Sequence, residues 1–202
     1  MTETHLRLGH PLQHLEPSLH NGPGWRVALW TQGCRHRCTR HCLNPHYLNP
    51  KAGHNYPVSA VLSALRQSIQ AAARPVEGLS ILGGEPFEQA AALAEVLAPL
   101  QAEGLSTMVY SGHTHDWLLQ QADPGIAALL AVTDLLVDGP FLPEAYAENL
   151  AWRGSSNQRL LCLSPRYTPA ALAEAHARQG KAFSIRLGPS SYAIAGFQRP
   201  ES

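Results

Sequence analysis

Three cysteines lie close together in the segment Gly-Cys-Arg-His-Arg-Cys-Thr-Arg-His-Cys, residues 33–42. Cys34, Cys38 and Cys42 recur at four-residue steps, so one loop can bring their thiols to a common metal centre. A four-iron cluster normally takes four cysteine thiolates. Three thiolates leave one iron open to a small molecule, much as a catalytic zinc ion keeps one position free.

Two other interpretations of the triplet remain open. A zinc ion could take the three thiolates together with His36 or His41, but zinc sites usually pair two separated ligand doublets, and a second doublet is not visible. Inert core cysteines suit isolated positions better than a triplet flanked by arginine and histidine. The spacing therefore favours an iron–sulfur cluster. Cys162, within Leu-Leu-Cys-Leu, is predicted to be a small buried hydrophobic residue.

Composition and charge narrow the class of protein. The chain has 202 residues, 45% hydrophobic and 15% charged, which suits a single α/β domain over residues 1–202. Fifteen basic and fifteen acidic residues balance, so we expect neither nucleic acid nor a membrane surface as a partner. An apolar run of ~20 residues and a secretory signal are both missing, which predicts a cytoplasmic protein with reduced cysteines.

Short apolar runs alternate with stretches of helical spacing along most of the chain. Strands are predicted at 26–31, 79–82, 107–110, 134–137, 183–185 and 192–195. Helices are predicted at 58–73, 87–102, near 114 and at 169–179. Residues 1–24 resemble an N-terminal arm, and residues 43–57 are predicted to be a loop. The alternation predicts an α/β fold, with a parallel sheet covered by helices.

Glycine-containing polar segments follow the predicted strands. They are Gly-Cys at 33–34, Gly-Gly-Glu-Pro at 83–86, Ser-Gly-His at 111–113 and Asp-Gly-Pro at 138–140. The carboxyl ends of parallel strands share one edge of a sheet, where ligands bind. We therefore expect the four segments to converge on one site.

Taken in order, these motifs resemble the radical S-adenosylmethionine (SAM) activating enzymes, the family that includes the activating proteins of anaerobic ribonucleotide reductase. The resemblance spans residues 20–160. It is carried by the turn Asn21–Gly24, the cysteine loop, Gly83–Pro86, Val137–Phe141 and Trp152–Gln158.

The resemblance implies a partial (β/α) barrel of the radical SAM type, with a [4Fe–4S] cluster and SAM as cofactors. Reductive cleavage of SAM would give methionine and a 5′-deoxyadenosyl radical, which abstracts a hydrogen atom. The leading expectation is activation of a glycyl-radical partner enzyme, with flavodoxin or ferredoxin as electron donor. The alternatives are a radical SAM enzyme that modifies a peptide or small molecule, and a non-enzymatic zinc or iron–sulfur module.

The resemblance also assigns roles to residues. Cys34, Cys38 and Cys42 match the cluster ligands. The SAM site is matched by His41, Leu43, Gly83, Gly84, Glu85, Pro86, Ser111 and Asp138. In this assignment the Gly-Gly-Glu-Pro segment meets the SAM amino group, His41 and Leu43 lie near the adenine, and Ser111 and Asp138 bind carboxylate or ribose.

Several of these residues also have structural interpretations. Glu85 could cap the helix that starts near Phe87, and Asp138 could belong to a plain turn. The segment Ser155–Asn157 could brace a loop, and Thr114 could cap a helix.

The chain departs from the family pattern in two places. Three residues rather than two separate Cys38 from Cys42, which changes how the loop meets a cluster. The chain also continues through residues 160–202, an extension that could enlarge the sheet or cover the open side of the barrel.

Overall fold

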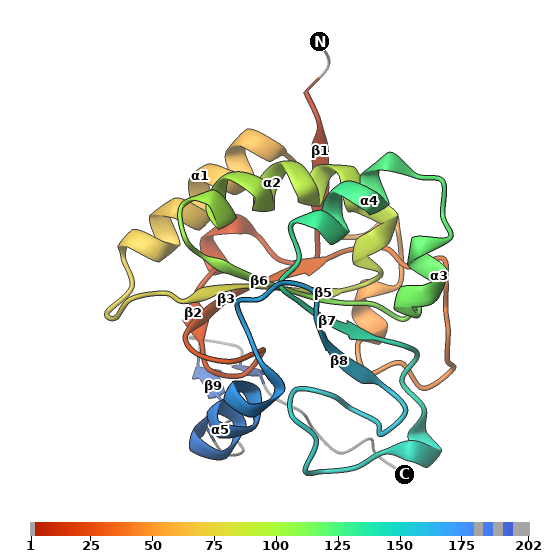
Figure 1. Ribbon diagram of the computed structural model, residues 1–202. Helices are drawn as coiled ribbons and strands as arrows, with labels where there is room; N and C mark the ends of the chain where they lie inside the picture. Colours follow the sequence, from red (N-terminus) through yellow and green to blue (C-terminus); the bar gives the residue numbers. More distant parts are fainter. Residues whose placement is uncertain (1–2, 180–183, 188–191, 196–202) are drawn as a thin grey trace.

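The computed structural model describes residues 3–179, 184–187 and 192–195, and its centre is a mixed sheet (Figure 1). Seven strands follow the order β4-β1-β3-β5-β6-β7-β8, and β2 pairs with β3. The bounds are β1 His5–Leu8, β2 Pro17–Ser18, β3 Arg26–Thr31, β4 His54–Pro57, β5 Gly78–Gly83, β6 Ser106–Tyr110, β7 Leu135–Asp138 and β8 Arg159–Cys162. The central strands β3, β5, β6 and β7 are parallel, whereas β1, β2, β4 and β8 join antiparallel.

Helices connect the parallel strands and cover one face of the sheet (Figure 1). The bounds are α1 Val58–Gln70, α2 Ala90–Ala102, α3 His115–Leu119, α4 Pro124–Ala131 and α5 Pro169–Gln179, with short 3-10 turns η1 Leu12–His14, η2 Pro45–Tyr47, η3 Pro86–Gln89 and η4 Pro143–Ala145. Helices α1, α2 and α4 lie on one face, and α5 lies on the other. The sheet path is open at β4 and β8, so the predicted class, a partial barrel-type α/β fold with parallel strands covered by helices, is confirmed.

Alternate side chains of the strands enter two separate cores, as the pleat of a sheet requires. Ile81, Val109 and Leu136 belong to the larger core beneath α1, α2 and α4. The smaller core on the second face contains Met108, Leu135, Val137, Trp152 and Leu172. Because Leu172 comes from α5, the C-terminal segment packs directly on the second face.

A buried arginine links this segment to the second face. Arg26, at the start of β3, donates to Ser80 Oγ at 2.8 Å and to Ser106 Oγ at 2.7 Å. Tyr167, just before α5, donates to Ser106 Oγ at 2.7 Å and accepts from Arg26 Nη1 at 3.4 Å. Gln179, at the end of α5, donates to two carbonyl groups of residues 19–22. The extension thus covers part of the second face of the sheet.

Several elements differ from the predicted ones. Strand β3 and helix α5 have the predicted bounds, but β1 and α4 were not predicted. The predicted loop 43–57 contains η2 and β4, so that prediction was wrong there. Strand β4 has a largely exposed, polar sequence and is extended because it pairs with β1.

The two late strands form a separate pair. β9 Ser184–Leu187 and β10 Tyr192–Ala195 pair with each other, and Phe183 lies outside the described residues. No described helix combines the length and apolar character that crossing a membrane requires.

Candidate functional site

The clustered cysteines lie on the loop that leaves the C-terminal end of β3. All three are free thiols, with Cys34 buried, Cys42 half-buried and Cys38 exposed. Backbone N–H groups are directed at two of the sulfurs: Arg37 N lies 3.5 Å from Cys34 Sγ, and Asn44 N lies 3.4 Å from Cys42 Sγ. Hydrogen bonds of this kind stabilise a thiolate and tune the iron–sulfur clusters that thiolates hold.

Two of the three thiols lie in surroundings that oppose their ionisation when no metal is bound. Burial raises the pKa of Cys34 and of Cys38, and the nearby carboxyl of Glu85 adds to both increases. A metal centre supplies the positive charge that makes thiolates stable, so this donor set suits metal binding. Within the described part of the chain, three Cys, His, Asp or Glu side chains nowhere converge closely enough to hold a single ion. In a cubane each thiolate binds a different iron, so its ligands need not converge on one point.

Strand β5 ends in two glycines that let its backbone contact the cysteine loop. Gly83 has a φ of +109°, and a Cβ there would lie 2.2 Å from Thr31 O. A Cβ on Gly84 would lie 2.0 Å from Gly33 O. Gly84 N donates to Thr31 O and Glu85 N donates to Gly33 O, each at 2.9 Å. A side chain at either glycine would push the two segments apart.

The next residue, Glu85, joins the ends of two strands through its buried carboxyl group. Its Oε1 accepts the N–H of Phe87 and the hydroxyl of Ser111, both at 3.0 Å, and its Oε2 accepts the N–H of Gly112 at 2.9 Å. The first bond caps η3, so the predicted capping role is confirmed. Burial raises the pKa of Glu85 to about 7, although these three bonds oppose the rise. Its charge therefore changes near neutral pH.

A further set of contacts, not predicted from the sequence, holds the first half of the cysteine loop. Glu88 Oε1 accepts the backbone N–H of Arg35 and, at 3.2 Å, that of His36. The His36 ring stacks on His113 with centroids 3.7 Å apart, and His113 stacks on Trp117 at 3.8 Å. Burial, with a smaller contribution from His36, lowers the pKa of His113 to about 4, so this ring is neutral at neutral pH. These partners are far apart in the sequence, so no local pattern signals them.

Asp138, at the end of β7, is a buried carboxylate paired with the exposed Arg159 rather than part of an open turn. Arg159 Nε donates to its Oδ1 at 3.0 Å, and the N–H of His115 donates to its Oδ2 at 2.6 Å. Burial acts to raise the pKa of Asp138, but the bonds from Arg159 and His115 outweigh it and lower the pKa. Thr114 caps α3, as predicted, by accepting the N–H of Trp117 at 3.2 Å.

The Gly-Ser-Ser-Asn-Gln segment braces the Asp-Gly-Pro turn, as its structural interpretation predicted. Asn157 and Gln158 donate to carbonyl groups of that turn at 2.7 and 3.2 Å. A Cβ on Gly154 would lie 2.9 Å from Leu43 Cδ1, so this segment also touches the end of the cysteine loop. His41, the other proposed adenine neighbour, is exposed.

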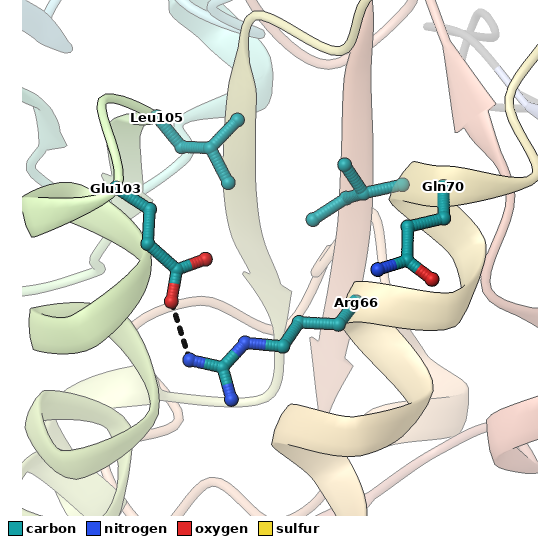
Figure 2. Close-up of a pocket in the computed structure, with 5 residues that line it drawn as sticks. Arg66, Gln70, Glu103 and Leu105 are labelled. Carbon is teal, nitrogen blue, oxygen red and sulfur yellow. Dashed lines mark hydrogen bonds and ion pairs between the residues drawn. The ribbon is translucent and has the colours of Figure 1, made fainter.

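A separate hollow of about 290 Å³ lies near the amino ends of the parallel strands, away from the cysteine loop. It is lined by Arg66, Ile69, Gln70, Glu103 and Leu105, and Arg66 and Glu103 form an ion pair across it (Figure 2). None of the predicted site residues lines this hollow, so it is not part of the candidate site.

The chain is similar to known proteins over the region that forms this edge. A family model described as "4Fe-4S single cluster domain" matches residues 20–161. An anaerobic ribonucleoside-triphosphate reductase-activating protein of Vibrio cholerae is 32% identical over 142 residues, 68% of this chain and 88% of the relative. The protein of the same name from Escherichia coli K12 is 29% identical, over 72% of this chain and 94% of its own length. The solved structure of Escherichia coli QueE has a TM-score of 0.40 and 13% identity, covering 85% of this chain and 67% of that one.

The fold and the cysteine loop define an iron–sulfur protein built on parallel strands. The chain belongs to the 4Fe–4S single cluster domain family, and the predicted resemblance to activating enzymes is confirmed by its relatives. The family match ends at residue 161, so helix α5 and the rest of the extension lie beyond it.

Proposed function

We propose that this chain is a radical SAM enzyme that cleaves SAM reductively and activates a glycyl-radical partner enzyme by hydrogen abstraction. The observation that carries the proposal is the loop with three free thiols, which rests against the glycine-rich end of β5. The match to a single-cluster iron–sulfur family supports the same chemistry.

In this proposal Cys34, Cys38 and Cys42 hold the [4Fe–4S] cluster. The N–H groups directed at the sulfurs of Cys34 and Cys42 stabilise their thiolates. Cys162 lies on β8 against the smaller core, on a different element from the cysteine loop, and is not assigned as a ligand. When bound, the cluster supplies the electron that splits SAM into methionine and a 5′-deoxyadenosyl radical.

The segment from Gly83 to Pro86 would bind the SAM amino group. Backbone carbonyls in a tight glycine turn are good acceptors for ammonium protons, and the carboxylate of Glu85 adds negative charge nearby. A bound ammonium group would favour the ionised form of Glu85 and so lower its pKa. The hydroxyl of Ser111 already donates to Glu85, so Ser111 would orient that carboxylate.

The remaining predicted contacts divide into two groups. His41 and Leu43, beside the third cysteine, would lie against the adenine. Asp138 is already bonded to Arg159 and to the N–H of His115, so we propose that it positions the start of α3 instead of touching the cofactor.

The partner follows from the relatives, whose names describe activation of an anaerobic ribonucleoside-triphosphate reductase. We propose a glycyl-radical enzyme of that kind as the substrate, a flavodoxin or ferredoxin as the one-electron donor, and the cytoplasm as the location. The reduced thiols that the cluster requires are maintained in that compartment.

The proposal is tested by anaerobic reconstitution of the wild type, Cys38→Ala and Cys162→Ala, followed by assays of iron, sulfide and 5′-deoxyadenosine. We expect Cys38→Ala to lose cluster and cleavage together, while Cys162→Ala retains both. Equal 5′-deoxyadenosine production by Cys38→Ala and the wild type would refute the ligand assignment. A loaded wild-type cluster without SAM cleavage would refute the enzymatic function.

A further inference from the structure

The cysteine loop concentrates positive charge on a chain whose formal net charge is zero. Residues 34–42 include Arg35, Arg37 and Arg40 and contain no acidic residue. All three arginines are exposed, and their side chains form no hydrogen bond or ion pair with the described part of the chain. Glu88 contacts this loop through the backbone N–H groups of Arg35 and His36, so the three guanidinium groups remain available to an acidic partner.

An exposed aromatic side chain is linked to the same loop by stacked rings. Trp117 is 42% exposed and stacks on His113, which stacks in turn on His36, the residue between Arg35 and Arg37. Aromatic and arginine side chains together are typical of protein–protein interfaces. We call Arg35, Arg37, Arg40 and Trp117 the arginine surface.

We propose that the arginine surface docks the electron donor, a redox protein with an acidic face. The proposal rests on the proposed function, because it places the donor directly over the loop assigned to the cluster. Complementary charge would steer the donor to this loop and orient it there. One electron passes from the reduced donor to the oxidised cluster, the donor is oxidised by one electron, and no bond forms or breaks.

Geometry favours the donor over the glycyl-radical partner as the occupant of this surface. Hydrogen abstraction requires the partner's glycine to touch the radical beside SAM, next to the Gly83–Pro86 segment. Electron transfer requires only close approach to the cluster, which the solvent-facing side of the cysteine loop allows. The arginine side chains are on that side, since all three are exposed.

The test compares two doubly charge-reversed forms of the cluster-loaded chain. Arg37→Glu with Arg40→Glu changes the surface, whereas Arg74→Glu with Arg178→Glu changes the net charge equally at exposed sites outside it. Binding of fluorescently labelled flavodoxin is measured anaerobically at low and at physiological salt. We expect the first variant to bind about tenfold more weakly than wild type at low salt and to lose most of the salt dependence. The control should stay within about twofold of wild type.

Two results would overturn the docking proposal. One is equal flavodoxin binding by the two variants. The other is that the Arg37→Glu, Arg40→Glu variant loses heparin binding but keeps flavodoxin binding, which would indicate a general polyanion site. Cleavage of SAM driven by dithionite bypasses the protein donor, so it tests the proposed function separately from the docking of the donor. If flavodoxin binds as expected but dithionite drives no cleavage in any form, the proposed function fails while the docking surface stands.

Discussion

At the scale of single residues, Glu85 is where the ends of β5 and β6 meet. Its two carboxyl oxygens accept three donors, from Phe87, Ser111 and Gly112, in a buried position. A glutamine has one acceptor oxygen, and its NH₂ group would face a donor. The shape of the side chain is kept, but at least one buried donor loses its partner.

We therefore expect Glu85→Gln to lower the free energy of unfolding by about 1–3 kcal/mol. Chemical denaturation of the reduced, metal-free chain at pH 8 measures the change. Glu174→Gln, an exposed position on α5, is the control and should change little. Equal stability of the two variants would show that the carboxylate bonds contribute nothing.

The raised pKa of Glu85 also predicts a pH dependence of stability. The folded chain holds this proton up to about pH 7, whereas an ordinary glutamate releases it near 4.5. Between these values the unfolded state binds fewer protons, so this group lowers the unfolding free energy as pH rises, and its effect is constant above the folded pKa. Titratable histidines contribute equally to the unfolding free energies of wild type and Glu85→Gln, so their contributions cancel when the two values are subtracted. That difference should therefore vary between about pH 4.5 and 7, and a pH-independent difference would contradict the assignment.

At the scale of elements, the ends of β7, β8 and α3 are joined by one buried carboxylate. Asp138 receives bonds from Arg159 on β8 and from the backbone of His115 in the first turn of α3. Helix α3 also carries Trp117, which stacks on His113 beside the cysteine loop. The carboxylate thus helps to position the helix that supports the loop.

We expect Asp138→Asn to destabilise the chain by about 1–2 kcal/mol, because Arg159 loses its negative partner and keeps only a neutral amide, while its own charge remains partly solvated. Thermal denaturation measures the size of the destabilisation. Faster hydrogen exchange at the His115 amide would show that it is located at the start of α3. Asp123→Asn, which alters a cap of α4, should be nearly neutral because asparagine caps as well as aspartate. Unchanged exchange at His115 in Asp138→Asn would contradict this role.

The elements also show what the sequence could predict. Strands β3, β5 and β6 were predicted because apolar runs end at glycine-containing turns, and their ends carry the expected cysteine loop, Glu85 and Ser111. Strands β1 and β4 were missed because tertiary pairing, not local propensity, makes them extended. The support of the loop by Glu88 and by His113 could not be predicted, since it depends on contacts between distant segments.

At the scale of the whole molecule, the C-terminal extension closes part of the sheet face that the larger core leaves open. Tyr167 bonds to Ser106 and Arg26, and Leu172 of α5 joins the core on that face. These contacts lie at the amino ends of β3 and β6, whereas the cysteine loop lies at the carboxyl end of β3. A substrate would therefore approach from the cysteine-loop end.

The closure predicts that Tyr167→Phe destabilises the chain by about 1–2 kcal/mol, because the buried Arg26 loses an acceptor. Chemical denaturation measures the decrease in the free energy of unfolding. We also expect limited proteolysis after residue 163 to be faster in Tyr167→Phe than in the wild type. Tyr146→Phe is the matched control, since the Tyr146 hydroxyl forms no hydrogen bond with the described residues. Proteolysis at the same rate in both variants would argue against this closure.

The central claim is that three cysteines leave one iron of a cluster free for SAM. Electron paramagnetic resonance of the reduced, anaerobically reconstituted chain, recorded with and without SAM, tests it most directly. We predict that SAM changes the spectrum of the reduced cluster in the wild type and in Cys162→Ala. The claim would be contradicted by a fully loaded cluster whose spectrum does not change when SAM is added, or by a chain that holds stoichiometric tetrahedral zinc instead.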